Sequence, residues 1–101
     1  MHKVRMAPSA EGDLLDGFQF YERQESGVGD YFLLCLASDI ESLGIYTGVH
    51  PRSHHGLYRT ASKRFPSSIY YQFDGDTAIV AAVLDARRNP NSIQRALSGR
   101  Q

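Results

Sequence analysis

The residues best suited to chemistry in this sequence are the basic side chains of its second half. Guanidinium and ammonium groups bind phosphates and carboxylates through charge-assisted hydrogen bonds. Arg87 and Arg88 follow a long apolar run, and a rigid strand of that kind can hold side chains at its exit in a controlled geometry. We therefore expect a phosphate-facing surface made from Arg59, Lys63, Arg64 and Arg88, provided that the fold brings them together.

The distribution of charge also predicts one basic face on a molecule that is neutral overall. Residues 1–50 carry three Lys or Arg against eight Asp or Glu, a net charge of −5, whereas residues 51–101 carry eight against three, a net charge of +5. A basic face attracts phosphates or an acidic partner. The alternative is an unevenly charged, solvated surface, on which Arg87 and Arg88 only cap loop carbonyls or pair with Asp85 and Asp74.

The first half of the chain predicts one strand and two helices. Residues 2–6 alternate as a strand does, and a helix over residues 9–25 follows, with Ser9 as its N-cap. Its apolar face comprises Leu14, Leu15, Phe18 and Tyr21. Ser26 is the expected cap of a second helix that extends to Leu43 or Tyr46, with an apolar stripe of Val28, Phe32, Cys35, Leu36, Ile40 and Leu43. The connection is short, so the two helices are expected to be antiparallel neighbours.

The second half predicts three strands and a short tail helix. The strands cover residues 57–64, 69–73 and 78–84, and an Asp-Gly turn joins the last two. Residues 78–84 are apolar without alternation, which is typical of a central strand. A helix over residues 91–97 follows. The chain is therefore expected to form one α+β domain over residues 1–101, with both long helices on one face of a small sheet and the other face open.

Several classes of protein are disfavoured by the composition. No apolar run approaches the ~20 residues of a membrane helix, and the first residues lack the apolar core of a secretion signal, so a cytoplasmic protein is expected. Cys35 is the single cysteine and is interpreted as core filler. His50, His54 and His55 share one loop, but no cysteine or carboxylate stands at a supporting spacing, so neither a metal site nor a cofactor is predicted.

An ordered series of residues along nearly the whole chain resembles the RelE/ParE superfamily of bacterial toxins. The series comprises Pro8-Ser9-Ala10-Glu11, Asp13-Leu14, Tyr21, Gly27-Val28-Gly29, Phe32, Pro51-Arg52, Arg59, Arg64-Phe65-Pro66, Ile69-Tyr70-Tyr71, Ile79-Val80, Ala82-Val83 and Arg87-Arg88-Asn89-Pro90. The resemblance implies a β-α-α-β-β-β fold with a helical hairpin on a mostly antiparallel sheet. It also implies the toxin of a type II toxin–antitoxin, or plasmid stabilisation, system, which inhibits growth until a cognate antitoxin binds it.

Two activities occur in this superfamily, and the resemblance leaves both open. RelE-like members cleave messenger RNA in the ribosome, and Arg59, Lys63, Arg64, Asp85 and Arg88 are the candidate catalytic residues for that reaction. Arg88 matches the late-strand arginine of the nucleases, but Ser68 and Gln94 replace their usual basic residue and tyrosine. Asp85 stands where many relatives have histidine, and beside arginines it should stay ionised and act as a weak base. We therefore favour a ParE-like toxin that poisons DNA gyrase and is not an enzyme.

Other expectations concern partners. An inactive relative that only binds its antitoxin stays open, as does an unrelated nucleic-acid-binding domain. Arg59, Arg64, Arg87 and Arg88 are candidate binding residues, and Tyr46, Tyr58 and Tyr70 are candidate exposed anchors for an antitoxin helix and its extended tail. A homodimer or a toxin–antitoxin heterotetramer is the expected assembly. The central spatial prediction is that the guanidinium groups of Arg59, Arg64 and Arg88 converge on one patch.

Overall fold

A computed structural model describes residues 1–52 and 54–100 of the chain, and of His54 only the backbone. The elements follow in the order β1 (Lys3–Met6), α1 (Pro8–Gln24), α2 (Val28–Glu41), α3 (Leu43–Tyr46), the short 3-10 helix η1 (His54–Gly56), β2 (Tyr58–Ala61), β3 (Ser67–Phe73), β4 (Thr77–Asp85) and α4 (Pro90–Leu97). The predicted α+β class and the strand-helix-helix-strand-strand-strand order are confirmed. None of the helices in the described residues has the length and apolar composition that a bilayer crossing requires.

The four strands form one sheet in the order β1-β4-β3-β2. β1 runs parallel to β4, while β4 with β3 and β3 with β2 are antiparallel. β4 is the longer of the two central strands, and its residues from Val80 to Leu84 are all buried. The apolar composition of β4 therefore reflects burial on both of its faces, as a central position requires.

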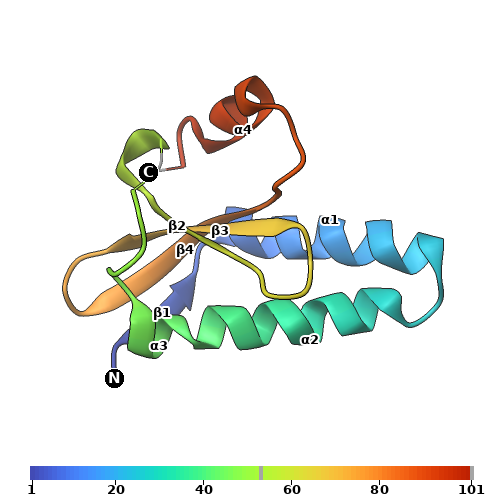
Figure 1. Cartoon of the computed structure of the whole chain (residues 1–101), viewed down its shortest axis with the longest axis horizontal. Coiled ribbons are helices and arrows are strands. Elements are labelled where there is room, and N and C mark those ends of the chain that lie inside the picture. Colours follow the sequence, from blue (N-terminus) through green and yellow to red (C-terminus); the bar gives the residue numbers. More distant parts are fainter. Residues whose placement is uncertain (53, 101) are drawn as a thin grey trace.

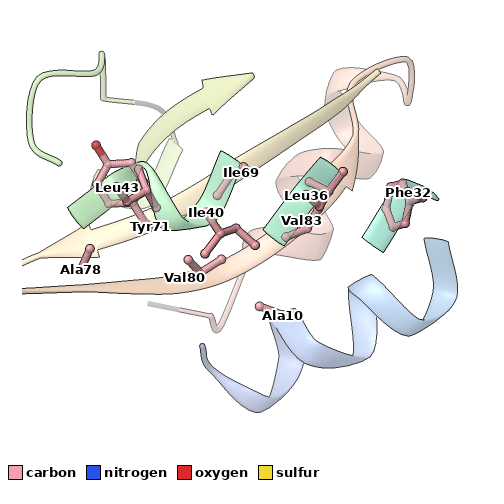
Figure 2. Close-up of a cluster of buried hydrophobic side chains, with 10 residues drawn as sticks. All are labelled: Ala10, Phe32, Leu36, Ile40, Leu43, Ile69, Tyr71, Ala78, Val80 and Val83. Carbon is pink, nitrogen blue, oxygen red and sulfur yellow. The ribbon is translucent and has the colours of Figure 1, made fainter. Parts of the chain in front are cut away.

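The helical hairpin covers one face of this sheet and forms the larger core. α1 and α2 run antiparallel on the same side of the strands (Figure 1). Figure 2 shows side chains of α2 directed at strand residues of β3 and β4, with Ala10 of α1 beside them. The cluster comprises Ala10, Phe32, Leu36, Ile40, Leu43, Ile69, Tyr71, Ala78, Val80 and Val83. Of the predicted stripe, Phe32, Cys35, Leu36 and Ile40 of α2 and Leu43 of α3 pack in this core, whereas Val28 is not part of it. Leu15 of α1 points away from the core and is 55% exposed.

The opposite face of the sheet carries a smaller core beneath α4. Ile93, Ala96 and Leu97 of α4 pack against a cluster that includes Tyr70 and Leu84 of the sheet. Figure 1 shows α4 on the side of the strands away from the hairpin. The tail helix was predicted, but the expectation of an open second face was wrong. The apolar spacing of Ile93, Ala96 and Leu97 was the signal that this helix covers a surface.

Beyond the end of β1, two side chains of α1 hydrogen-bond to the backbone of β4 in place of a neighbouring strand. β1 pairs only with residues 77–80 of β4. A bulge follows, because Tyr70 pairs with Ala82 while Tyr71 pairs with Val80. Beyond it, the Ser9 hydroxyl donates to the Ala81 carbonyl at 3.0 Å, and Val83 N–H donates to Asp13 Oδ2 at 2.9 Å. Ser9 is therefore not the cap of α1, which has Ala7 in that position, and it fastens the helix to the sheet instead.

The turn between the long helices is capped from the preceding helix rather than by Ser26. The Glu22 carboxylate accepts from Gly27 N–H at 3.0 and 3.1 Å and from Gly29 N–H at 3.0 Å. Gly27 has φ 94°, a left-handed conformation that glycine adopts without a steric penalty. A Cβ on Gly29 would lie 2.7 Å from the Phe18 carbonyl oxygen, so this glycine permits the close approach of the helices.

Most predicted boundaries are within two residues of those in the structure, and two differ by more. α2 ends at Glu41, and the separate α3 forms the rest of the expected second helix. β2 ends at Ala61 instead of continuing to Arg64, because the chain turns away from β3 after Ala61 pairs with Ser68. The residues 62–66 form a loop, here called the 62–66 loop. Lys63 and Arg64 are consequently on this loop and not on a strand.

Candidate functional site

Arg59 lies on the edge strand β2, on the face of the sheet that α4 covers. It pairs across the strands with Tyr70, and residues directly opposite each other share a face. Its Nε donates to Ser68 Oγ at 3.1 Å, and the side chain is half-buried. Ser68 is the position at which the resemblance expected a basic residue, and here it positions the guanidinium of Arg59.

Lys63 and Arg64 are held beside the outward surface of α2. The 62–66 loop is attached to that helix by Asp39, which is 7% exposed and accepts from Ser62 Oγ at 2.6 Å and from Lys63 N–H at 3.3 Å. Both cationic side chains are exposed. Together with α2 they border a hollow of about 340 Å³, here called the α2 hollow, lined by Tyr31, Leu34, Cys35, Ser38, Asp39, Lys63 and Arg64.

The residues after β4 form a compact charged turn. Arg87 Nη2 and Asp85 Oδ2 are 2.7 Å apart, and Arg87 Nε donates to Asp85 Oδ1 at 3.0 Å. The Arg87 guanidinium, through this hydrogen bonding, holds the pKa of Asp85 below its usual value. Asp85 is therefore an ionised, weakly basic carboxylate, as predicted from its neighbours. Arg88 is exposed and donates through Nε and Nη2 to Ser92 Oγ at 3.0 and 2.7 Å, so it rests against the first turn of α4.

Asp85 and Arg88 share a second hollow with α1. It measures about 310 Å³ and is lined by Asp13, Asp16, Gly17, Phe20, Tyr21, Phe32, Ser67, Val83, Leu84, Asp85 and Arg88. Burial raises the pKa of the Tyr21 phenol, which stays protonated. Asp13 accepts from Arg100 Nη1 at 2.6 Å, so its carboxylate is already occupied. The exposed ring of Phe20, the Asp16 carboxylate and the Arg88 guanidinium are groups here that a partner can reach.

The three arginines expected to converge lie beside three different elements. Arg59 contacts Ser68 on the α4 side of the sheet, Arg64 borders the α2 hollow, and Arg88 borders the hollow beside α1. None of the hydrogen bonds described for Arg59 and Arg88 joins two of the three arginines, and the α2 hollow and the hollow beside α1 contain different ones. Arg59 and Arg88 therefore bind different serines. The convergence of the three guanidinium groups on one patch stays a prediction.

The candidate tyrosine anchors have different environments. Tyr46 at the end of α3 is 57% exposed, as an anchor requires. Tyr58 is half-buried, stacked on Tyr71 with ring centroids 5.3 Å apart, and Arg52 lies 4.7 Å above its ring. Tyr70 is only 2% exposed because α4 covers it. Tyr70 is therefore a core residue and not an exposed anchor.

One polar cluster was not anticipated from the sequence. The buried Tyr71 hydroxyl lies 2.6 Å from His50 Nδ1 and accepts from Gly48 N–H at 3.0 Å. Burial raises the pKa of Tyr71 and lowers the pKa of His50, so both groups stay neutral near pH 7. His50 thus anchors its loop to the sheet, whereas His55 is exposed. Within the described residues, no three His, Cys, Asp or Glu side chains are grouped so that they could hold a metal ion.

Sequence comparisons give no relatives, while the fold has a solved counterpart. No protein-family model matches the sequence. No curated protein matches it either. A chain of the solved structure described as "Chromosomal ParDE TA system from P. aeruginosa" superimposes with a TM-score of 0.76, covering 84% of this chain and 96% of that chain. This chain has the RelE/ParE-like fold. The two sequences are 13% identical, so the likeness is one of architecture.

Proposed function

We propose that this chain is the growth-inhibiting toxin of a type II toxin–antitoxin pair, that it acts in the cytoplasm by poisoning DNA gyrase, and that a cognate antitoxin neutralises it. The observation that carries the proposal is the superposition on a chain of a ParDE toxin–antitoxin structure over 96% of that chain's length. The series of residues that resembles the superfamily supports it independently of the coordinates.

The environment of Arg88 favours the gyrase-directed activity over messenger RNA cleavage. Cleavage needs a general base for the 2′-hydroxyl and an acid for the leaving oxygen. Asp85 is bound by Arg87, and its lowered pKa makes it a poor base and no acid near pH 7. Among the described residues, neither histidine nor lysine lines the hollow that contains Asp85 and Arg88. A toxin that acts by binding needs no such pair.

An apolar groove on the helical hairpin supports an antitoxin partner. It measures about 590 Å³ and is lined by Met6, Glu11, Leu14, Leu15, Phe18, Asp30 and Leu33. Leu15, which lines it, is 55% exposed, and Phe20, five residues further along α1, is 46% exposed. Exposed apolar side chains on a small protein mark a surface that a partner covers. We assign this groove, here called the hairpin groove, to an amphipathic helix of the antitoxin.

Two assays test the proposed target. Purified protein is added to gyrase with relaxed or supercoiled plasmid, and we expect inhibited supercoiling and an accumulation of cleaved DNA trapped with the enzyme. Unchanged supercoiling with no trapped complex contradicts gyrase poisoning. If the target is instead the translating ribosome, transcripts are truncated during translation and Arg88→Ala abolishes the truncation, with the exposed Arg23→Ala as the charge-matched control.

A growth assay tests the toxin itself. Induced expression should arrest growth, and coexpression with the protein encoded by the adjacent gene should restore it. A chain that leaves growth unchanged and still binds that protein is an antitoxin-binding module without toxicity. Size-exclusion chromatography with light scattering then distinguishes a homodimer from a toxin–antitoxin heterotetramer.

A further inference from the structure

The 62–66 loop is fixed from two sides. On one side the buried Asp39 carboxylate binds Ser62 Oγ and Lys63 N–H. On the other, the Phe65 ring inserts among the hairpin aromatics, with centroids 4.9 Å from Tyr21 and 5.2 Å from Phe32. A loop held in this way presents its side chains with little conformational freedom left to lose on binding.

The α2 hollow beside this loop combines cationic and apolar surface. Leu34 is 71% exposed and Tyr31 is 47% exposed, although both belong to a helix of the folded core. Lys63 and Arg64 are exposed, and neither forms an ion pair within residues 1–52 and 54–100. The Asp39 carboxylate at the base is engaged by the loop. The accessible groups are therefore two cations and the Ser38 hydroxyl beside two apolar side chains.

We propose that the α2 hollow docks a short segment of a partner protein in which an apolar side chain is flanked by carboxylates. The apolar residue covers Leu34 and Tyr31, and the carboxylates pair with Lys63 and Arg64. This complementarity of charge and apolar surface identifies the occupant. In identifying the partner with the antitoxin, the inference rests on the proposed function and adds a second contact region to the hairpin groove.

A nucleic-acid strand fits the same surface poorly. α2 carries Asp30, Asp39 and Glu41, and their negative charges repel a phosphate backbone that follows the helix. Tyr31 offers one exposed ring but Leu34 offers only an aliphatic contact, whereas single strands bind through several aromatic faces on which successive bases stack. A segment with isolated carboxylates next to an apolar residue satisfies Lys63 and Arg64 without extending along the acidic helix.

A defined peptide tests the inference directly. The probe is a fluorescent peptide of about 14 residues with leucine and glutamate at helical spacing, and its control has glutamine at every glutamate position. We expect the acidic peptide to bind the whole protein at least about tenfold more tightly than the control, with binding that weakens as salt rises. In ¹H–¹⁵N spectra, the largest shift changes should fall on residues 31–38 and 62–65.

Matched variants assign the binding to the α2 hollow. Lys63→Gln with Arg64→Gln should weaken peptide binding about tenfold or more, whereas Arg5→Gln with Arg23→Gln removes the same charge elsewhere and should change it less than about twofold. Leu34→Ser should weaken binding, and Val49→Ser, at a 73% exposed loop position, should not. Thermal unfolding of each variant establishes that the fold is retained.

Several results would overturn the inference. These are equal binding of the acidic and glutamine peptides, no binding of either, shift changes confined to the hairpin groove, or displacement of the peptide by a single-stranded oligonucleotide that binds more tightly. The outcome is separable from that of the proposed function. If the adjacent gene product neutralises the toxin and binds wild type and the Lys63/Arg64 variant equally, the docking site is wrong and the toxin–antitoxin assignment stands. If growth is unaffected and the peptide still binds as expected, the docking site stands and the assignment as a toxin is wrong.

Discussion

The two faces of the sheet are covered in different ways. The hairpin face provides most of the stability, and the α4 face is expected to open locally more easily. On the hairpin side, two long helices bury a cluster that includes Phe32, Leu36 and Tyr71. On the other side, α4 is an eight-residue helix whose inward residues are Ile93, Ala96 and Leu97. The hairpin side relies on apolar area, which is the dominant stabilising contribution in folding. The α4 side buries less and depends more on polar contacts.

Three polar contacts hold α4 and the chain after it. The Asn89 side chain accepts from Ser92 N–H at 2.8 Å and caps the helix, and Arg88 donates to Ser92 Oγ. Arg100 forms an ion pair with Asp13 of α1 at 2.6 Å. Segments with few buried apolar contacts open locally at a lower free energy than the global core. The α4 side should therefore open before the hairpin side.

The largest effect is expected in the hairpin core. Leu36→Ala removes a fully buried side chain between the helix and the sheet and should lower the free energy of unfolding by about 3 kcal/mol. Leu34→Ala, two residues earlier but 71% exposed, should change it by less than about 0.5 kcal/mol. Urea unfolding followed by circular dichroism measures both variants. Similar values for the two would contradict the assignment of this face as the main core.

A smaller global effect with a local signature is expected beneath α4. Leu97→Ala should cost about 2 kcal/mol, at the low end for a buried leucine, because the end of the chain can relax into the space. Amide hydrogen exchange should accelerate in residues 90–97 more than in α2. If exchange rises equally in both regions, the two faces unfold as one unit and the comparison fails.

The contacts of Asp13, which link α1 to Arg100 and to β4, are expected to contribute less to the free energy of unfolding than either core. Asp13→Ala removes the partner of Arg100 and the acceptor of Val83 N–H, and it should cost about 1.5 kcal/mol because a partly buried donor loses its partner. The matched control is Asp16→Ala, an exposed carboxylate one helical turn later. Arg100→Gln should produce only part of the loss, since Asp13 keeps its bond to Val83. An Asp16 variant as unstable as the Asp13 variant would contradict this role.

The smallest effect is expected in the pH dependence of stability, through His50, which anchors its loop to Tyr71 on the hairpin face. Burial lowers the pKa of His50, so the unfolded chain binds more protons than the folded one as pH falls below about 6.5. Stability is therefore fully present above that pH and declines as the pH falls below it. His50→Gln should flatten this slope in unfolding measured at each pH. An unchanged slope would assign the pH dependence to other groups.

The sequence predicted those features that depend on local pattern. Most of the apolar stripe of α2 and the double-faced burial of β4 were read from the pattern of residues, because helices and strands have fixed periods. The ionised state of Asp85 followed from its nearness to Arg87 in the chain. The errors lay where another side chain or segment competes for a group. Ser9 binds Ala81, which is distant in the sequence, and Glu22 rather than Ser26 caps the next helix from the end of the preceding one.

What the amino-acid sequence determined by itself was the kinds and order of the elements and the family of folds they resemble. Only the tertiary structure decided which surface each arginine faces. Arg59 is bound to Ser68 of the neighbouring strand, the loop that carries Arg64 is tied to Asp39 of α2, and Arg88 is bound to Ser92 of α4. The physical reason is that a side chain's direction depends on the register and anchoring of its backbone, which long-range hydrogen bonds establish.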